Sequence, residues 1–477
     1  MNYADTARVK TILLNCWFSY EDKQENADII ILITCSVRQK SEDKITGLLQ
    51  DIKPNQKIRI SGCMIQHNIR NNKLTNKKLP TNLKVGNFWW IINPENYEIV
   101  WSTTKEIKDN KWNKTIIPIN NAFNPQFFNI KKTFDNLELF WRIDDTWFLP
   151  KILEKIWYKI SYDKDLLNEY EKIIPENENT SMIKNHKKTA YIPISTGCNQ
   201  FCSYCIVPYA RGLERNFEIE NIINECKTHL DNWAEELVLL WQIVNKHPKF
   251  TEIVKEVLKL DGLKRLRYTS PYPTYYTDEL LKLHETEDKL CPQIHIPFQS
   301  WSDKILKSMN RGYNSKQALE FIDKIKNLKR DISITTDIIV GFPNEPEEDF
   351  NASLELVRYG TFDMVYIGIY SPRPWTYADK NIPDNIPYEI KQNRWEQMNN
   401  LLNETSKQNN QNEIWNKKLV LINNFITKDI NSNYKYEWHS DNMKRVIINS
   451  NEELKEWQFI KTKITKGLAF KLYWEIE

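Results

Sequence analysis

The stretch TAYIPISTGCNQFCSYCIVPYARG, residues 189–212, decides how the rest of the chain is interpreted. Its first residues have the apolar pattern of a strand, and the loop that follows carries Cys198, Cys202 and Cys205. Three thiols at C-x3-C-x2-C spacing raise the question of what they hold, and we consider three answers.

Two of these answers suit the spacing poorly. A structural zinc ion needs four ligands, and the fourth would have to be His186 or a distant thiol. A disulfide with one spare thiol does not suit a chain whose eight cysteines are too sparse for a secreted scaffold. A four-iron, four-sulfur cluster held by three cysteines leaves one iron open to a further ligand, so we prefer this interpretation.

Strands and helices alternate after the cysteine loop. This pattern predicts a full or partial (β/α) barrel over residues 187–410, with active-site residues at the carboxyl ends of its strands. The helical segments include TDELLKLHETE and NSKQALEFIDKIKNL. The predicted strands begin with TAYIPIS and continue with ELVLLW from 236, LKRLRYTS from 263, QIHIPFQ from 293, ISITTDIIVGF from 332 and FDMVYIGIYS from 362.

The flanking regions predict two further domains of an α/β protein. In residues 1–157, the strands DIIILIT and KIRISGC enclose a helical segment, which indicates a parallel α/β domain, with an irregular part at 68–135 and a strand, turn and helix after it. Residues 158–186 are polar and are predicted to be a linker. Residues 411–477 contain short alternating segments that predict a small β-barrel: KLVLINNF, KRVIINS, FIKTKITK and AFKLYWEI.

Composition limits the kinds of partner and the cellular compartment that we expect for the protein. Lys and Arg number 66 against 63 Asp and Glu, which excludes a strongly basic chain but leaves room for local basic patches. The N-terminus has no apolar signal-peptide core, and the longest apolar runs, such as IIILI at 29–33, are strand-sized. We expect a cytoplasmic monomer with no membrane partner.

Several motifs together resemble the radical S-adenosylmethionine (SAM) methylthiotransferases that modify tRNA. This resemblance implies an N-terminal methylthiotransferase domain, a radical SAM barrel and a C-terminal RNA-binding TRAM barrel. It also implies that the open iron binds SAM and that reductive cleavage yields a 5'-deoxyadenosyl radical. The motifs are GCNQFCSYCIVPYARG, ITCSVRQKSEDK, SGCMIQ, QSWSDKILKSMNRGY, TTDIIVGFPNEPEEDF and IYSPRPWTYA.

The resemblance also implies which residues line the SAM site. They lie after two predicted strands of the barrel, and for Asp337 a capping carboxylate is an equal alternative. Arg211 and Arg215 could meet RNA phosphate or the cofactor, or be ordinary surface residues. The residues implied at the SAM site are Asp337, Gly341, Pro343, Glu345, Gln299, Ser300 and Arg311.

A second, auxiliary 4Fe–4S cluster is implied in the N-terminal domain, where the inserted sulfur is assembled. Cys35 and Cys63 follow its two predicted strands and match two of the three ligands. The third corresponds to a position just upstream of Met1, so we expect either an upstream start or an incomplete auxiliary cluster. Cys16 is predicted to be a packing residue at a helix end.

Basic residues alternate with apolar ones in the C-terminal segments. They predict a face that contacts the phosphate backbone, although a merely solvated face is a comparable alternative and the TRAM resemblance decides between them. These residues are Lys444, Arg445, Lys461, Lys463 and Lys466.

Tryptophan outnumbers glycine, 17 to 11, although average usage would give roughly 33 glycines in this length. We hypothesise that the gene uses UGA for glycine, which predicts local backbone strain, because glycine tolerates positive φ and tryptophan does not. The alternative is a surface enriched in tryptophan for stacking on RNA bases. Six tryptophans stand where the resemblance implies glycine: Trp17, Trp241, Trp301, Trp375, Trp457 and Trp474.

The implied reaction is methylthiolation of the C2 carbon of an N6-isopentenylated adenosine beside the tRNA anticodon. Its partners would be tRNA, SAM and an electron donor such as flavodoxin or ferredoxin. One alternative is the related enzyme for threonylcarbamoyl-adenosine. The other is a zinc-stabilised RNA-binding protein without turnover.

Overall fold

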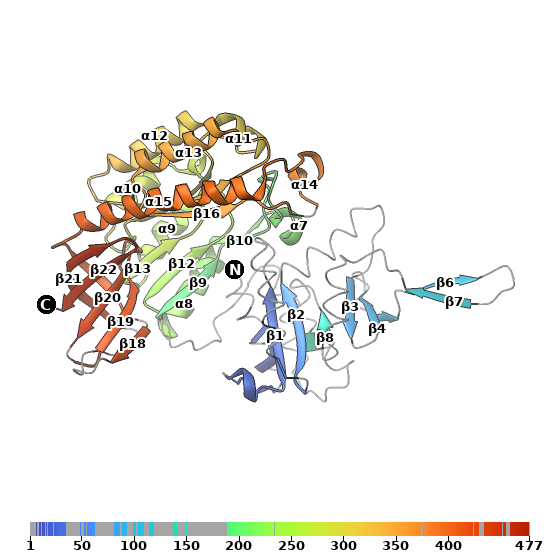
Figure 1. The fold of residues 1–477 in the computed structure, drawn as a ribbon. Helices are drawn as coiled ribbons and strands as arrows, with labels where there is room; N and C mark the ends of the chain where they lie inside the picture. Colours follow the sequence, from blue (N-terminus) through green and yellow to red (C-terminus); the bar gives the residue numbers. More distant parts are fainter. Residues whose placement is uncertain are drawn as a thin grey trace. The chain divides into compact units, whose positions relative to one another are not determined.

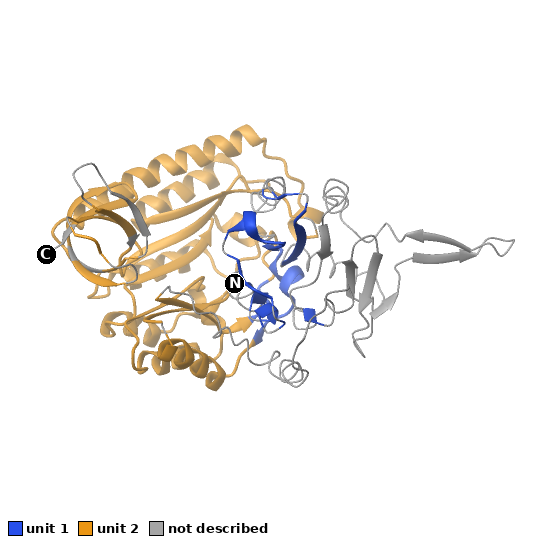
Figure 2. Cartoon of the chain, turned by 90° about the horizontal axis from the view of Figure 1, so that it is seen from below, with its two compact units in different colours: residues 1–183, 196–200, 205–215 blue, residues 184–195, 201–204, 216–477 orange. Residues whose placement is uncertain are grey.

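A computed structural model describes most of residues 188–476 and shorter stretches before them (Figure 1). The chain divides into two compact units, coloured in Figure 2: Met1–Ile183, Thr196–Gln200 and Cys205–Arg215 form the first, and Lys184–Ser195, Phe201–Tyr204 and Asn216–Glu477 the second. Among the described residues, no helix is both long and apolar enough to cross a bilayer. The described residues are 6, 9–10, 12–14, 16, 18–21, 23–34, 48, 52–53, 55–62, 81–85, 88–92, 99–101, 104–108, 114–118, 137–140, 149–150 and 188–476 without 233, 374, 423, 429–433, 451 and 455–457.

The first unit contains a mixed sheet of six strands in the order β1-β2-β8-β3-β4-β5. The predicted parallel pair is confirmed: β1 (Ile29–Thr34) runs parallel to β2 (Lys57–Gly62), with Thr34 opposite Gly62. Ile58 and Ile60 on one face of β2 and Arg59 on the other are all fully buried, so this strand is covered on both faces. The predicted strand after residue 136 is β8 (Leu137–Phe140), parallel to β2. Most of the predicted helix between β1 and β2 lies outside the described residues.

The prediction of an irregular segment at 68–135 is wrong, because five strands form there. The connection between β3 and β4 has the sequence Gly-Asn, a pair typical of two-residue hairpin loops, so the signal was present among the polar residues. Antiparallel pairing joins β3 to β4, β4 to β5 and β6 to β7. The strands are β3 Thr81–Val85, β4 Phe88–Ile92, β5 Ile99–Trp101, β6 Thr104–Lys108 and β7 Lys114–Pro118.

The second unit contains six parallel strands in two sheets of three, ordered β13-β12-β9 and β14-β15-β16, with a single bridge between Leu266 and Leu290. This arrangement confirms the predicted β/α alternation. The strands are β9 Thr189–Pro193, β12 Glu236–Leu240, β13 Arg265–Tyr268, β14 Gln293–Gln299, β15 Ser333–Val340 and β16 Met364–Ile369.

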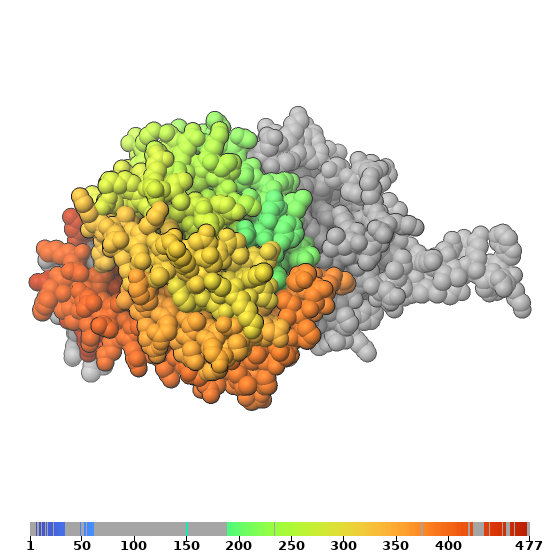
Figure 3. Space-filling view, turned by 90° about the horizontal axis from the view of Figure 1, so that it is seen from above, coloured from blue at the N-terminus to red at the C-terminus, as the bar shows by residue number. Residues whose placement is uncertain are grey.

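Helices follow these strands and cover one of their faces (Figure 1). In β14, Ile294, Ile296 and Phe298 are fully buried, whereas Gln293, His295 and Pro297 are only half-buried. Figure 3 shows one face of the molecule, on which atoms coloured green through orange lie side by side. The helices are α8 Ile219–Asn232, α9 Phe250–Leu258, α10 Asp278–Thr286, α11 Asp303–Ser308, α12 Ser315–Lys326, α13 Glu347–Gly360, α14 Tyr377–Asn381 and α15 Tyr388–Asn412. Short elements are η1 Gln24–Asn26, β10 Ser195–Thr196, α7 Val207–Arg211, β11 Arg215–Asn216, η4 Val244–Lys246 and η5 Pro273–Tyr275.

The C-terminal segment forms a six-stranded sheet in the order β17-β21-β22-β20-β19-β18, mostly antiparallel. Its core contains Val420, Val446, Ile464 and Leu472, all fully buried. Two of its strands, β18 and β19, were not among the segments predicted from alternation. The strands are β17 Lys417–Leu421, β18 Asn424–Lys428, β19 Tyr434–His439, β20 Arg445–Ser450, β21 Phe459–Leu468 and β22 Lys471–Ile476.

Buried polar contacts fix this sheet to the barrel. Arg267 on β13 donates to the backbone carbonyls of Ser440 and Asp441, both at 2.8 Å. Lys444 is buried and pairs with Asp363 at 2.9 Å and Glu413 at 3.2 Å. The expectation that Lys444 contacts phosphate is therefore wrong, because this ammonium group already holds two parts of the fold together.

Candidate cluster and cofactor site

The four residues Phe201–Tyr204, which include Cys202, are anchored in the second unit between α11 and α14. Ser203 donates from its backbone N–H to Met309 at 3.0 Å and from its hydroxyl to the carbonyl of Ser308 at 2.8 Å. Its own carbonyl accepts from the Ala378 N–H at 2.8 Å. Hydrogen bonds from Ser203 to the end of α11 and to α14 therefore hold the neighbouring Cys202 in place, and the Cys202 side chain is buried.

Arg311, predicted to line the SAM site, contacts this cysteine directly. Its Nη1 donates to the Cys202 sulfur at 3.3 Å. Its other nitrogens donate to the Pro297 carbonyl at 2.7 Å and to the Tyr313 hydroxyl at 3.3 Å. The sequence thus identified both residues, and the structure brings them together although they are 109 positions apart.

In the first unit, the cysteine loop turns tightly around glycine. Gly197 has φ of +75°, and a Cβ there would overlap the Leu213 carbonyl oxygen. The Cys198 N–H donates to the Gly212 carbonyl at 3.0 Å. Cys198 is buried and Cys205 half-buried. Arg211 is buried and Arg215 is exposed, so of the two arginines after the cysteines only Arg215 has the exposure expected for an RNA contact.

Across the described residues, no three His, Cys, Asp or Glu side chains gather closely enough to hold a metal ion. The donor chemistry nevertheless suits an iron–sulfur cluster. Three thiols from one short loop are the ligand type and number that a 4Fe–4S cluster with one open iron needs, and the Arg311 guanidinium donates to the Cys202 sulfur. These residues fit the cluster that the resemblance implies.

Asp337 lies within β15 and faces a histidine. Its Oδ2 is 3.3 Å from His295 Nε2, and the other ring nitrogen of His295 is 2.9 Å from the Thr335 hydroxyl. The Tyr366 ring meets the imidazole edge-on at 5.7 Å between centroids. His295 was missed from the sequence, although its place on the strand QIHIPFQ, between two apolar residues, could have indicated it.

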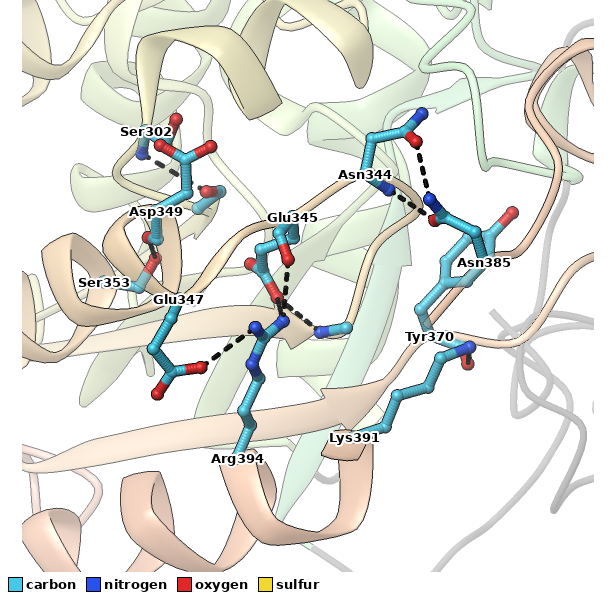
Figure 4. A network of polar contacts seen from close by, with 12 residues as sticks. Ser302, Asn344, Glu345, Glu347, Asp349, Ser353, Tyr370, Asn385, Lys391 and Arg394 are labelled. Atoms are coloured by element: carbon cyan, nitrogen blue, oxygen red, sulfur yellow. Dashed lines mark hydrogen bonds and ion pairs between the residues drawn. The ribbon is translucent and has the colours of Figure 1, made fainter. Parts of the chain in front are cut away.

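The loop after β15 forms a closed polar network (Figure 4). Glu345 is buried, and its Oε2 accepts from the Gly341 N–H at 2.7 Å and from Arg394 Nη1 at 3.0 Å. Burial raises the pKa of the Glu345 carboxyl to about 7, against the lowering effect of these two donors. Arg394 also pairs with Glu347 at 3.0 Å. Glu345 therefore joins the loop to α15.

Gly341 is required by the packing of the same loop. Its φ is +71°, and a Cβ there would overlap the Lys391 side chain. Lys391 is itself buried and pairs with Asp384 at 2.6 Å. The contacts of Gly341 and Glu345 are thus internal to the fold, and their predicted role at the SAM site stays a prediction, as does that of the buried Pro343.

Gln299 and Ser300 lie at the carboxyl end of β14, where the sequence placed them. Gln299 has a backbone φ of +74°. Ser300 is fully buried, and its hydroxyl accepts a hydrogen bond from the Ser302 N–H at 3.3 Å. This strand end also leads into α11, which positions Arg311.

The predicted auxiliary ligands Cys35 and Cys63 lie outside the described residues. Each follows directly after the last residue of β1 or β2, and those last residues, Thr34 and Gly62, are paired. Cys16 is buried, and burial raises the pKa of its thiol to about 11, in keeping with a packing role.

Comparison with known proteins first gives the class. Residues 192–357 match the radical SAM superfamily, and residues 1–86 match the Uncharacterized protein family UPF0004. Together with parallel strands and a cysteine loop after the first of them, this match defines a radical SAM protein.

Similarity to curated proteins then gives the family. The chain is 30% identical to the tRNA-2-methylthio-N(6)-dimethylallyladenosine synthase of Carboxydothermus hydrogenoformans, over 99% of this chain and 96% of that protein. It is 31% identical to the synthase of Clostridium tetani, over 99% of this chain and 93% of that protein. The chain belongs to this family of radical SAM methylthiotransferases.

Among solved structures, the chain is similar to a radical SAM methyltransferase from Kitasatospora setae, with a TM-score of 0.46 and 11% identity. That similarity covers 79% of this chain and 71% of the other.

Proposed function

We propose that this protein methylthiolates the C2 carbon of N6-isopentenyladenosine beside the anticodon of tRNA. The observation that carries the proposal is similarity to the synthases over nearly the whole chain, combined with a C-x3-C-x2-C loop at the end of the first barrel strand. A 4Fe–4S cluster with SAM bound supplies hydrogen abstraction from an unactivated carbon, which acid–base side chains cannot perform.

The chain's own residues would bind and position these groups. Cys198, Cys202 and Cys205 would hold the SAM-binding cluster. The half-buried His295 and Asp337 and the exposed Tyr366 place hydrogen-bonding groups and an aromatic ring on one side of the barrel strands, suited to a flat heterocycle. Gln299, Ser300 and Arg311 would form the SAM-facing end of β14.

The N-terminal and C-terminal parts would complete the enzyme. Cys35 and Cys63 would hold the auxiliary cluster, each following one of two paired parallel strands. The C-terminal sheet would act as a TRAM-like RNA-binding domain, with Lys461 and Lys466 exposed on β21. A flavodoxin or ferredoxin would deliver electrons, and the enzyme would act as a cytoplasmic monomer.

Anaerobic reconstitution tests this function. The full chain is loaded with iron and sulfide, reduced, and incubated with SAM and with tRNA that carries isopentenyladenosine. We expect methylthio-isopentenyladenosine by nucleoside mass spectrometry, and none with Cys202→Ala. A matched tRNA that carries threonylcarbamoyl-adenosine should remain unmodified. Modification of that tRNA instead would favour the related enzyme, and a colourless zinc protein without SAM cleavage would overturn the proposal.

A further inference from the structure

Arg311 is a half-buried cation held beside a proposed cluster ligand. Its guanidinium stacks on the rings of Tyr272 and Tyr313, at 4.6 and 5.3 Å from the ring centroids. The Tyr313 hydroxyl in turn donates to the Phe298 carbonyl at 2.7 Å, and the Tyr272 hydroxyl accepts from the Gly312 N–H at 2.8 Å. This cage fixes the direction in which Nη1 points.

The charge of Arg311 has no carboxylate partner in the part of the chain that the structure describes. Its three hydrogen-bond acceptors are a thiol, a carbonyl and a phenol. A cation that is partly removed from water is more stable beside a negative charge, because part of its hydration has been lost. Of these three acceptors, only the Cys202 sulfur takes on negative charge as a metal ligand.

We infer that Arg311 is a positioning residue that donates a charge-assisted hydrogen bond to the Cys202 thiolate and raises the reduction potential of the SAM-binding cluster. The physical reason is that reduction adds negative charge to the cluster, and a nearby cation with an N–H donor stabilises the reduced form more than the oxidised form. The inference rests on the proposed function, since it needs a cluster on this loop.

The experiment measures the midpoint potential of this cluster alone. In a Cys35→Ala and Cys63→Ala background, the full chain carries only the SAM-binding cluster, and iron content verifies its loading. Redox titration followed by EPR compares Arg311, Arg311→Lys and Arg311→Gln, each without and with SAM. We expect the potential to fall in the Gln variant and to fall less in the Lys variant, which keeps the charge but loses the fixed geometry.

The matched control is Arg358→Gln on α13. Arg358 is exposed and pairs with Glu355, so its loss should leave the potential unchanged. Equal potentials in all Arg311 variants without SAM would overturn the inference, even if their affinity for SAM fell, because Arg311 would then serve SAM binding only. Failure of both variants to load iron would also overturn it, since Arg311 would then be needed to form the site. Failure of the parent to load a cluster would instead refute the proposed function.

A second and independent observation concerns Trp375 and Trp415. Both have left-handed backbone, with φ of +75° and +78°. The glycines with positive φ lie between +71° and +77°, whereas most other residues with positive φ lie between +49° and +62°. Left-handed backbone is a genuine outlier for a bulky residue, but glycine adopts it without penalty.

Neither indole has a packing role that would explain this conformation. Trp375 is 39% exposed and Trp415 is 67% exposed. Their rings contact the lysine ammonium groups of Lys380 and Lys463, at 5.1 and 4.9 Å from the ring centroids. The backbone, not the side chain, is what the fold uses at these two positions.

We infer that positions 375 and 415 are glycine in the protein made by its own cell, from UGA codons read there as glycine. Trp415 was not among the six positions predicted from sequence, so the backbone adds it independently. Trp474 gives no such support, because its indole is buried in the hydrophobic core of the C-terminal sheet and has a packing role there. Trp241 and Trp301 lack positive φ, so the expected strain is not found in their backbone, and Trp17 and Trp457 lie outside the described residues.

Peptide mass spectrometry of the protein isolated from its native host tests this second inference. We expect peptides with glycine at both positions and TGA at both codons. Trp395 on α15, whose indole donates to the Ile367 carbonyl at 3.3 Å, is the control and should be tryptophan if encoded by TGG. Tryptophan at 375 or 415 in the native protein would overturn the inference.

Discussion

Two arginines, Arg394 buried and Arg311 half-buried, lie near the carboxyl ends of neighbouring barrel strands, yet their partners differ in kind. Arg394 faces the loop after β15 and meets the carboxylates of Glu345 and Glu347 (Figure 4). Arg311 follows β14 and meets the Cys202 thiol instead. Arg394 therefore forms ion pairs within the fold, whereas the three hydrogen-bond acceptors of Arg311 are a sulfur, a carbonyl and a phenol. Arg394 thus closes a structural network, whereas the contacts of Arg311 are those expected of a residue beside the proposed cluster.

The largest expected effect is the loss of methylthiolation activity when the cysteine that Arg311 contacts is removed. Cys202→Ala removes one of three proposed cluster ligands, so methylthiolation should become undetectable and iron content should fall by the amount of one cluster. Because the segment is held by backbone bonds of Ser203, thermal stability without metal should change little. Iron analysis and nucleoside mass spectrometry measure the two effects. Unchanged iron content would contradict the assignment.

The next largest expected effect is a loss of folding stability when Arg394 is removed from its ion-pair network. Arg394→Ala leaves Glu345 buried without its cationic partner, which should destabilise the protein by about 3 kcal/mol. Denaturant unfolding measures this change. Arg358→Ala, at an exposed pair, should cost under about 0.5 kcal/mol. An equally small cost for Arg394→Ala would show that the network does not stabilise the loop.

A pH titration sharpens the comparison. The pKa of Glu345 is raised to about 7 by burial, so the folded state binds this proton more tightly than the unfolded state. Its contribution to stability is therefore full below the ordinary carboxyl pKa and is lost as pH rises toward 7. Between about pH 4.5 and 7, the free energy of unfolding of the wild type should fall by on the order of 2 kcal/mol more than that of Glu345→Gln. Parallel stability curves would exclude a raised pKa.

The smallest expected effect concerns the surface tryptophans. Trp375→Gly and Trp415→Gly should each stabilise the chain by about 1 kcal/mol, because glycine relieves the cost of left-handed backbone. Trp395→Gly, within α15, should destabilise it, since it introduces glycine into a helix and removes the indole. Thermal unfolding compares the three variants. Destabilisation by the first two would show that the indoles themselves matter.

Much of the fold was predictable because hydrophobic periodicity is local. Short apolar runs predicted all six barrel strands and both strands, β1 and β2, of the parallel pair in the first unit. The strands within 81–118 escaped prediction because their polar surroundings hide the alternation. Lys444 was misassigned because alternation shows which face of a strand a residue lies on. It does not show that Asp363 and Glu413 lie on that side and form ion pairs with the Lys444 ammonium group.

By itself, the sequence determined the class of chemistry, since ligand type and spacing within one loop are properties of neighbouring residues. It also determined that glycine is scarce and tryptophan abundant. Only the tertiary structure decided which arginine faces a thiol and which faces carboxylates, and that His295 meets Asp337. These contacts join residues tens of positions apart, and their partners depend on how strands and helices pack rather than on any local pattern.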